Sequence, residues 1–378
     1  MSRTDDIEAD AIVAVHTRVE RVADIRVNDA AGGYVVRALG ERGVAAVFVA
    51  AGAEGAYTKN EAGLWVVTAS LAVSSAEVGV ARLVDESTKL AVGELGGVTA
   101  MRSRTALRLP PGIDRIVPMV NGPEAIKLDN KLEQRRLFGD YMANGISVPP
   151  NGTIDVDALA ALPDKIWVKA SNGLSGKGSR SATKADAQRT LAELRAERRP
   201  GSEDPGWVIE EHDSGLPLPH LRATVPELQR FINTASTDAN HEIRMFSFID
   251  IIDGEPMVRI VPMFRYCAGG ADNTWIPVDI DSVESEAIQL AEQAARTLLA
   301  ATGYKGAHVA VDVYKSKDGR YKMREWNVRD PGMGSWLARG AQLLTASEQQ
   351  QMGAVANRQH GNGFGRLLAR LAKAPYNK

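Results

Sequence analysis

The chain has 378 residues, of which 44% are hydrophobic and 24% are charged, and its formal net charge is −2 at pH 7. This length allows two or three domains, and the near-neutral charge provides no general attraction to nucleic acid or to membranes. The single cysteine, Cys267, excludes an internal disulfide and a cysteine-built metal site. No run of about 18 apolar residues and no signal-peptide pattern is present, so the expected location is the cytoplasm.

The first 120 residues alternate β-branched runs with alanine-rich helical stretches. Strand patterns cover 12–18, 44–51, 64–70 and 113–120, and helical patterns cover 32–43 and 74–95. This rhythm predicts a small parallel sheet surrounded by helices. No GxGxxG follows the first strand, which argues against a dinucleotide-binding fold.

The middle of the chain mixes helical and strand patterns. One amphipathic helix is expected within 121–150, closed by Gly145 and Pro149–Pro150. Strands are expected at 166–171 and 207–212, separated by a glycine-rich loop and by a helix that begins near Thr183. The pattern does not assign residues 213–240.

Two helices are expected toward the C-terminus, an amphipathic one over 283–303 and a basic amphipathic one over 364–378. The basic tail could contact a membrane or nucleic acid. Basic amphipathic helices are more often solvated or packed in a dimer, and we favour that interpretation for residues 364–378.

A hairpin is predicted around Asp318-Gly319, because this dipeptide is typical of two-residue type I′ turns. Counting outward from that turn places Asp312 opposite Glu325 and Ala310 opposite Asn327. Directly opposed residues share one face of the sheet, with Cβ atoms about 4.5–5.5 Å apart. Two opposed carboxylates and an amide oxygen suit Mg²⁺, a hard cation that prefers oxygen ligands and whose binding would remove the repulsion between the acids.

The alternative is a surface hairpin whose acids are simply solvated. For an isolated Asp–Glu pair that interpretation would be preferred. Here Asn327 and the turn sequence DPGMG, residues 330–334, follow directly. This composition favours a metal site formed by Asp312, Glu325 and Asn327.

Two lysines accompany possible phosphate-binding elements. Lys169 lies in the strand at 166–171 and precedes SNGLSGKGS, in which the glycines occupy 173, 176 and 178. Glycines let backbone N–H groups approach phosphates, although a loop of this kind is also an ordinary flexible turn and this one is not a Walker A loop. Lys131 begins a helix and, taken alone, is an ordinary exposed lysine.

A second hairpin is predicted around Asp253-Gly254. Counting outward places Phe248 opposite Arg259 and Glu242 opposite Arg265, and Arg244 shares that face. Several arginines on one face could bind a carboxylate or a phosphate with two hydrogen bonds each. Salt bridges across a solvated sheet face are the alternative. Cys267, which follows closely, lacks the His and Asp partners of a nucleophile.

Together these segments resemble the ATP-grasp superfamily of carboxylate–amine ligases. The matching segments are LDNKLEQRRLFGDYMANGISVPP (128–150), WVKASNGLSGKGS (167–179), WVIEEH (207–212) and AVDVYKSKDGRYKMREWNVRDPGMGS (310–335). Their order and spacing fit the superfamily over roughly residues 115–340, and the last segment is similar to the D-alanine–D-alanine ligase pattern E-x-N-x-x-P-G-M.

The resemblance implies a mixed α/β and α+β ATP-grasp fold, in which an N-terminal parallel α/β domain precedes two α+β subdomains that clasp ATP. The expected divisions are an N-terminal domain at 1–120, a small subdomain with the lysines and the glycine loop at 121–212, a C-terminal subdomain with the metal site at 213–345 and a helical tail at 346–378.

The resemblance also implies roles for individual residues. ATP would be bound by Lys131, Lys169, Ser175, Gly176, Glu210, Glu211 and His212. Asp312, Glu325 and Asn327 would hold Mg²⁺, with Mn²⁺ as an alternative. Catalytic cations would be Arg244, Arg265 and Arg329.

Two departures from the superfamily pattern affect these assignments. Ala310 stands where the D-alanine ligases have an arginine, so Arg329 is a candidate replacement. The usual glutamate past the hinge strand is replaced by DSGLPLPH, residues 213–220, which leaves the ribose contact open.

The expected activity is ATP- and Mg²⁺-dependent joining of a carboxylate to an amine through an acyl phosphate, with release of ADP and phosphate. The substrates would be small molecules, an amino acid or a short peptide, and no nucleic-acid or membrane partner is expected; a homodimer remains open. The alternatives are a phosphotransferase on the same fold and a nucleotide-binding scaffold without catalysis.

Overall fold

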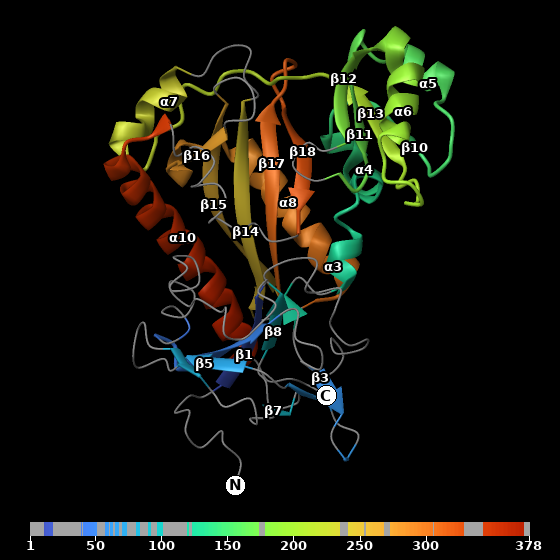
Figure 1. The fold of residues 1–378 in the computed structure, drawn as a ribbon. Helices are drawn as coiled ribbons and strands as arrows, with labels where there is room; N and C mark the ends of the chain where they lie inside the picture. The colour runs from blue at the N-terminus through green and yellow to red at the C-terminus, as the bar shows by residue number, and fades with distance from the viewer. Residues whose placement is uncertain are drawn as a thin grey trace.

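The structure is a computed structural model, and it describes most of the chain after residue 122 and shorter segments before it. The described residues are 11–17, 39, 41–50, 57–59, 61–62, 65–67, 70–73, 81–83, 90–91, 97–100, 119–120, 123–173, 178–234, 241–252, 255–267, 273–304, 306–328 and 343–373. Their strands form four sheets, and Figure 1 shows the N-terminal sheets at the foot of the molecule, a long central sheet, and a smaller sheet at the upper right.

The largest N-terminal sheet has six strands in the order β6-β5-β2-β1-β8-β9. These strands are β1 (Ala11–Thr17), β2 (Val44–Ala50), β5 (Ser70–Val73), β6 (Ala81–Leu83), β8 (Gly97–Ala100) and β9 (Met119–Val120). The pairs of β1 with β2, β1 with β8 and β8 with β9 are parallel, as the sequence predicts. The pairs of β2 with β5 and β5 with β6 are antiparallel, so the sheet is mixed.

The predicted helix over 74–95 is wrong, because this stretch contains two strands. β6 pairs with β5, and β7 (Leu90–Ala91) joins β3 (Tyr57–Lys59) and β4 (Trp65–Val67) in a three-stranded sheet. Pairing with β5 and β4 here overrides a local alanine-rich pattern, which is a general weakness of propensity arguments.

The predicted single helix within 121–150 is also wrong. α3 (Pro123–Lys127) ends early, and α4 (Lys131–Phe138) starts anew because the Asn130 side chain accepts a hydrogen bond from the Leu132 N–H at 2.8 Å and caps it. After the 3₁₀ turn η5 (Gly139–Tyr141), residues 145–148 form strand β10 (Gly145–Val148). Gly145 therefore begins a strand.

The small sheet is antiparallel, with the order β10-β13-β11-β12. Its other strands are β11 (Lys165–Ala170), β12 (Ser179–Thr183) and β13 (Trp207–Glu211). Alternate residues of β11 (Ile166, Val168 and Ala170) are buried against α5 (Val156–Ala160) and α6 (Ala187–Ala196). Thr183 caps a 3₁₀ turn, η6 (Lys184–Asp186), which leads into α6. Lys165, Trp167 and Lys169 consequently face the other side of the sheet.

The central sheet is antiparallel and has the order β16-β15-β14-β17-β18. Its strands are β14 (Glu242–Ile252), β15 (Glu255–Cys267), β16 (Asn273–Pro277), β17 (Gly306–Lys315) and β18 (Tyr321–Asn327). Odd-numbered residues of β14 and β17 pack with α8 (Ser285–Thr302), which ends at Gly303 with φ 68°. The even-numbered residues, Arg244 and Asp312 among them, therefore share the opposite face.

Residues 364–373 of the predicted C-terminal helix belong to a longer helix, α10 (Ala346–Lys373), which runs diagonally beside the central sheet (Figure 1), and residues 374–378 lie outside the described residues. Phe364 of α10 lies 5.2 Å from the His308 ring, which stacks on Phe248 at 4.4 Å. The previously unassigned region contains η7 (Pro226–Leu228) and α7 (Gln229–Asn233), and η8 (Ile280–Ser282) precedes α8. No helix among the described residues is long and apolar enough to cross a membrane.

The predicted pairing of Asp312 with Glu325 and of Ala310 with Asn327 is confirmed, but the turn that produces it is not the predicted one. The loop has three residues, Lys317–Gly319: the Ser316 N–H bonds the Arg320 carbonyl and only Gly319 has a positive φ, 86°. This shifts the register by one residue, and a bulge between Asp312 and Val313 shifts it back.

In the other hairpin, Glu242 pairs with Arg265 and Phe248 with Arg259, as predicted. The turn itself, residues 253–254, lies outside the described residues.

Candidate active site

The three predicted metal ligands lie together on one face of β17 and β18. Asp312 is 2% exposed and directly opposes Glu325, while Asn327 is two pairs further along, on the same face. The Asn327 amide nitrogen is buried and has no hydrogen-bond partner in the described part of the chain. The carboxylate oxygens of Asp312 and Glu325 and the amide oxygen of Asn327 are of the kind that a hard cation such as Mg²⁺ prefers. Among the described residues, no group of three or more His, Cys, Asp or Glu side chains could hold a metal ion.

Two cations contact these carboxylates. The Arg244 guanidinium, from β14, binds both oxygens of Asp312, with Nε–Oδ1 and Nη2–Oδ2 distances of 2.5 Å. The Lys131 ammonium lies 3.3 Å from Glu325 Oε2 and also donates to the Gly173 carbonyl at 2.9 Å. Lys131 therefore connects the start of α4, Gly173 at the start of the glycine-rich loop, and β18.

The pKa values of the two carboxylates are shifted in opposite directions. Burial raises the pKa of Asp312 to about 6, against the attraction of Arg244. Burial also acts to raise the pKa of Glu325, but Lys131, Arg244 and Lys169 outweigh it and lower that pKa to about 2. Both side chains are ionised at neutral pH, as a cation site requires.

The second predicted lysine, Lys169, makes an ion pair with Glu210 of β13. Glu210 is 4% exposed and also lies 3.2 Å from Arg135 of α4. Burial opposes ionisation of Glu210, yet Lys169 and Arg135 keep its pKa below the ordinary value. Lys169 and Glu210 share the face of the small sheet opposite α5 and α6.

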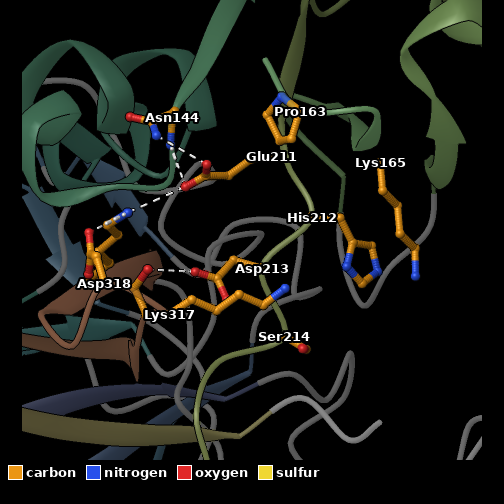
Figure 2. A pocket seen from close by; sticks show the side chains of 11 residues that line it. Asn144, Pro163, Lys165, Glu211, His212, Asp213, Ser214, Lys317 and Asp318 are labelled. Atoms are coloured by element: carbon orange, nitrogen blue, oxygen red, sulfur yellow. Dashed lines mark hydrogen bonds and ion pairs between the residues drawn. The ribbon is translucent and has the colours of Figure 1, made fainter.

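A cavity of about 670 Å³ lies where β13 ends and the chain crosses to the central sheet, a segment (residues 210–214) that we call the hinge (Figure 2). Glu211 and His212, both predicted to bind the nucleotide, line it together with Asp213 and Ser214. The lining is completed by Asn144, Pro163, Lys165, Ser316, Lys317, Asp318 and Lys322.

Within this cavity, Glu211 points toward Asn144, and His212 points toward Lys165 (Figure 2). Glu211 accepts hydrogen bonds from the Asn144 N–H at 3.2 Å and lies 3.3 Å from the Lys322 ammonium. The His212 ring stacks on Trp167 at 5.2 Å, and its pKa is lowered by burial and by the nearby Lys165 charge, which keeps it neutral at pH 7.

Three arginines of the central sheet, Arg244, Arg265 and Arg324, form a connected cluster with buried carboxylates. Arg265 binds the fully buried Glu242 at 2.5 Å, and the Arg324 Nε lies 3.1 Å from the other oxygen of Glu242. The Arg244 guanidinium stacks on the Trp275 ring at 4.5 Å. Arg259 does not join this cluster: its pKa is lowered by burial and then by Arg366 and Arg370 of α10, which places it at the far end of the sheet.

The comparisons with known proteins agree with this arrangement at the level of fold. The chain is similar to D-alanyl-alanine synthetase A from Vibrio cholerae, with 12% identity, a TM-score of 0.52 and coverage of 97% of this chain and 98% of that one. It is similar to the ATP-grasp ligase PsnB, with 14% identity, a TM-score of 0.52 and coverage of 97% and 100%. D-cycloserine synthetase DcsG also matches, with 12% identity, a TM-score of 0.50 and coverage of 94% and 99%.

The chain has the ATP-grasp fold. No protein-family model and no curated sequence matches it. The similarity to solved ATP-grasp structures therefore establishes the fold and leaves the reaction open.

The structure brings together most of the predicted site residues of this ATP-grasp chain. Ser175, Gly176 and Arg329 lie outside the described residues. Sequence reasoning missed Arg135, Lys322, Arg324 and Trp275. Arg324 directly precedes Glu325, so strict strand alternation predicts that the two side chains lie on opposite faces of the central sheet. The bulge in β18 instead brings Arg324 to the same face as Glu325.

Proposed function

We propose that this protein is an ATP- and Mg²⁺-dependent ligase that joins a carboxylate to an amine through an acyl phosphate and releases ADP and phosphate. The observation that carries the proposal is the opposed pair Asp312–Glu325, with Lys131 3.3 Å from Glu325. Phosphoryl transfer depends mainly on positioning and on neutralising charge, and this arrangement supplies a cation site beside lysines.

The charge balance of the site supports a polyphosphate ligand. Its carboxylates near the two lysines are Glu210, Asp312 and Glu325, and the cations that contact them are Lys131, Arg135, Lys169 and Arg244. The cations exceed the carboxylates by one. A bound triphosphate with its metal would offset this surplus.

In this proposal Asp312, Glu325 and Asn327 hold the metal, which when bound supplies charge to the transferring phosphoryl group. Lys131 and Lys169 contact phosphate oxygens, and the loop over 173–178 supplies backbone N–H donors. That loop leaves β11 and returns at Gly178, which has φ 72° and whose carbonyl accepts from the Ala170 N–H at 2.7 Å. The hinge residues Glu210, Glu211 and His212 contact the nucleobase.

The positive charge that Ala310 cannot provide comes, in this proposal, from the neighbouring strand. Ala310 is fully buried opposite Phe246. Arg244, on β14, is held beside Asp312 by an ion pair. Arg244 and Arg265 would bind the substrate carboxylate and the oxyanion of the tetrahedral intermediate, with Arg329 as a further candidate.

The substrates we propose are an amino acid or a short peptide as the carboxylate and a second small molecule as the amine. Two similar structures are named as synthetases of D-alanyl-alanine and D-cycloserine, and the PsnB structure holds a precursor variant with Mg and ADP. We further propose that residues 1–120, 121–212, 213–345 and 346–378 act as the substrate domain, the two ATP-binding subdomains and the tail.

The test is phosphate release measured with ATP, Mg²⁺ and panels of amino acids and dipeptides. Release that requires an added amine, with an amide product identified by mass spectrometry, is the expected result. A stable phosphorylated product without amide indicates a phosphotransferase. No nucleotide binding by calorimetry would overturn the proposal altogether, and binding without any turnover would favour the scaffold.

A further inference from the structure

Arg324 occupies an unusual position between the hinge and the buried arginine cluster. It is the residue of β18 that the bulge adds, since Val313 pairs with Met323 while Asp312 pairs with Glu325. Bulges redirect side chains, and this one brings two consecutive residues to the same region: Glu325 reaches Lys131, and Arg324 reaches Glu242.

Three contacts hold the Arg324 guanidinium, whose side chain is 13% exposed. Its Nη2 donates to the backbone carbonyl of Asp213 at 3.0 Å, its Nε lies 3.1 Å from Glu242, and its Cζ lies 4.2 Å from the centroid of the buried Tyr314 ring. The planar guanidinium of an arginine can donate to a carbonyl, form an ion pair with a carboxylate and stack on a ring at the same time, whereas the ammonium of a lysine cannot do all three.

Asp213 is the hinge residue that this contact fixes. Its side chain is also held, because Oδ1 accepts from the Gly215 N–H at 2.9 Å and Oδ2 accepts from the Ser316 hydroxyl at 2.6 Å. Its own N–H has no acceptor in the described part of the chain. Asp213 therefore lines the hinge cavity with its backbone fixed and one donor unused.

We propose that Arg324 is a positioning residue for nucleobase recognition: it fixes the Asp213 peptide of the hinge to the hairpin that carries Asp312 and Glu325. The inference rests on the proposed function, since it requires a nucleotide in this site. Base recognition then depends on β18, while phosphate binding by Lys131 and Lys169 does not depend on Arg324.

The experiment compares two probes that differ only in the part of the site they use. ADP contains the base, and inorganic tripolyphosphate does not. Isothermal titration calorimetry of both, at fixed Mg²⁺ and without substrates, measures binding without turnover. Arg324→Met should weaken ADP about tenfold, the effect of one lost hydrogen bond to a charged group, and leave tripolyphosphate within about twofold.

Two further variants separate positioning from folding. Arg324→Lys keeps the charge next to Glu242 but lacks the fork, so it should restore thermal stability more fully than ADP affinity. Arg320→Met is the matched control, because Arg320 lies on the same hairpin, is 73% exposed and pairs only with Asp318 among described residues. It should bind both probes like the unmodified protein.

Equal weakening of ADP and tripolyphosphate in Arg324→Met, or unchanged ADP affinity in both Arg324 variants, would overturn the inference. If the unmodified protein binds neither probe, the proposed function fails as well. If it binds both and the variants do not discriminate between them, only the role of Arg324 is wrong.

Discussion

Glu210 and Glu242 are almost entirely out of water, and two cations hold each of them. Glu210 contacts Lys169 and Arg135, and Glu242 contacts Arg265 and Arg324. A buried carboxylate that loses a partner keeps its desolvation cost without the compensating attraction. Mutations at these cations should therefore affect stability and ligand binding together.

Lys169→Ala should weaken ATP binding by about tenfold or more and lower the free energy of unfolding by about 1–3 kcal/mol, because Glu210 keeps only Arg135. Calorimetry and urea unfolding measure the two effects. Lys127→Ala, which removes an exposed lysine paired with Glu124, is the control. Unchanged nucleotide affinity in Lys169→Ala would remove this lysine from the site.

Glu325→Gln should reduce Mg²⁺-dependent turnover by about 10²–10³-fold, the usual effect of removing one main electrostatic group from an active site. The melting temperature should also fall modestly, because the substitution removes a carboxylate that Lys131, Arg244 and Lys169 stabilise, as its lowered pKa indicates. Phosphate-release kinetics over a Mg²⁺ titration measure the effect, with the exposed Glu227→Gln as control. Near-normal activity at saturating Mg²⁺ would refute the metal assignment.

At the scale of elements, α10 begins with a capping box. The Thr345 N–H donates to Glu348 Oε2 at 2.9 Å, the Glu348 N–H donates to the Thr345 hydroxyl at 3.3 Å, and Arg230 of α7 binds the same carboxylate. These contacts fix the start of a 28-residue helix that packs beside the central sheet. The bulge in β18 is the other element-scale feature that matters, since it determines which side chains reach the site.

Glu348→Gln should lower the free energy of unfolding by about 1 kcal/mol at pH 7. The hydrogen bond from Arg230 and then that from Thr345 lower the Glu348 pKa from 4.5 to about 2. A depressed carboxylate pKa stabilises the fold above the ordinary value, and this stabilisation is lost as pH falls from about 4.5 toward 2.

The stability difference between the unmodified protein and Glu348→Gln should therefore shrink between pH 7 and pH 3 in urea titrations. Glu292→Gln, in α8, controls for the loss of one carboxylate. A difference that stays constant with pH would show that the ionised capping box contributes nothing.

At the scale of the whole molecule, the site lies between separate sheets. Lys169 and Glu210 belong to the small sheet, and Asp312 and Glu325 belong to the central one. Direct links between the two groups include the contacts of Lys131 with Glu325, Lys322 with Glu211 and Arg324 with Asp213. A nucleotide bound between the sheets would add to these links.

ADP with Mg²⁺ should therefore raise the melting temperature, by an amount equivalent to about 2.7 kcal/mol at 100 times the dissociation constant. Differential scanning fluorimetry with ADP and Mg²⁺, compared with ADP and a chelator, measures it. The shift should be much smaller with the chelator and in Glu325→Gln. An equal shift with and without metal would contradict a metal-bridged nucleotide.

Local sequence patterns were enough to identify the residues of the proposed metal site. Strand alternation and an Asp-Gly turn sufficed to place Asp312, Glu325 and Asn327 together, and the hairpin at 253–254 placed Glu242 opposite Arg265 in the same way. These inferences succeeded because the side-chain period of a strand is short and local. The predicted pairing of Asp312 with Glu325 is correct although the predicted two-residue turn is not. The three-residue turn shifts the register by one residue, and the bulge shifts it back.

The surroundings of Asp312, Glu325 and Asn327 became visible in the three-dimensional structure alone. Arg135, Lys322 and Arg324 come from positions whose partners lie far away in the chain, and no local pattern predicts that Arg324 turns toward Glu242. The strands at 81–83 and 90–91 likewise form because the strands at 70–73 and 65–67 pair with them, although their own composition favours a helix. Long-range pairing and a single bulge, which short-range periodicity does not encode, set the final geometry of the site.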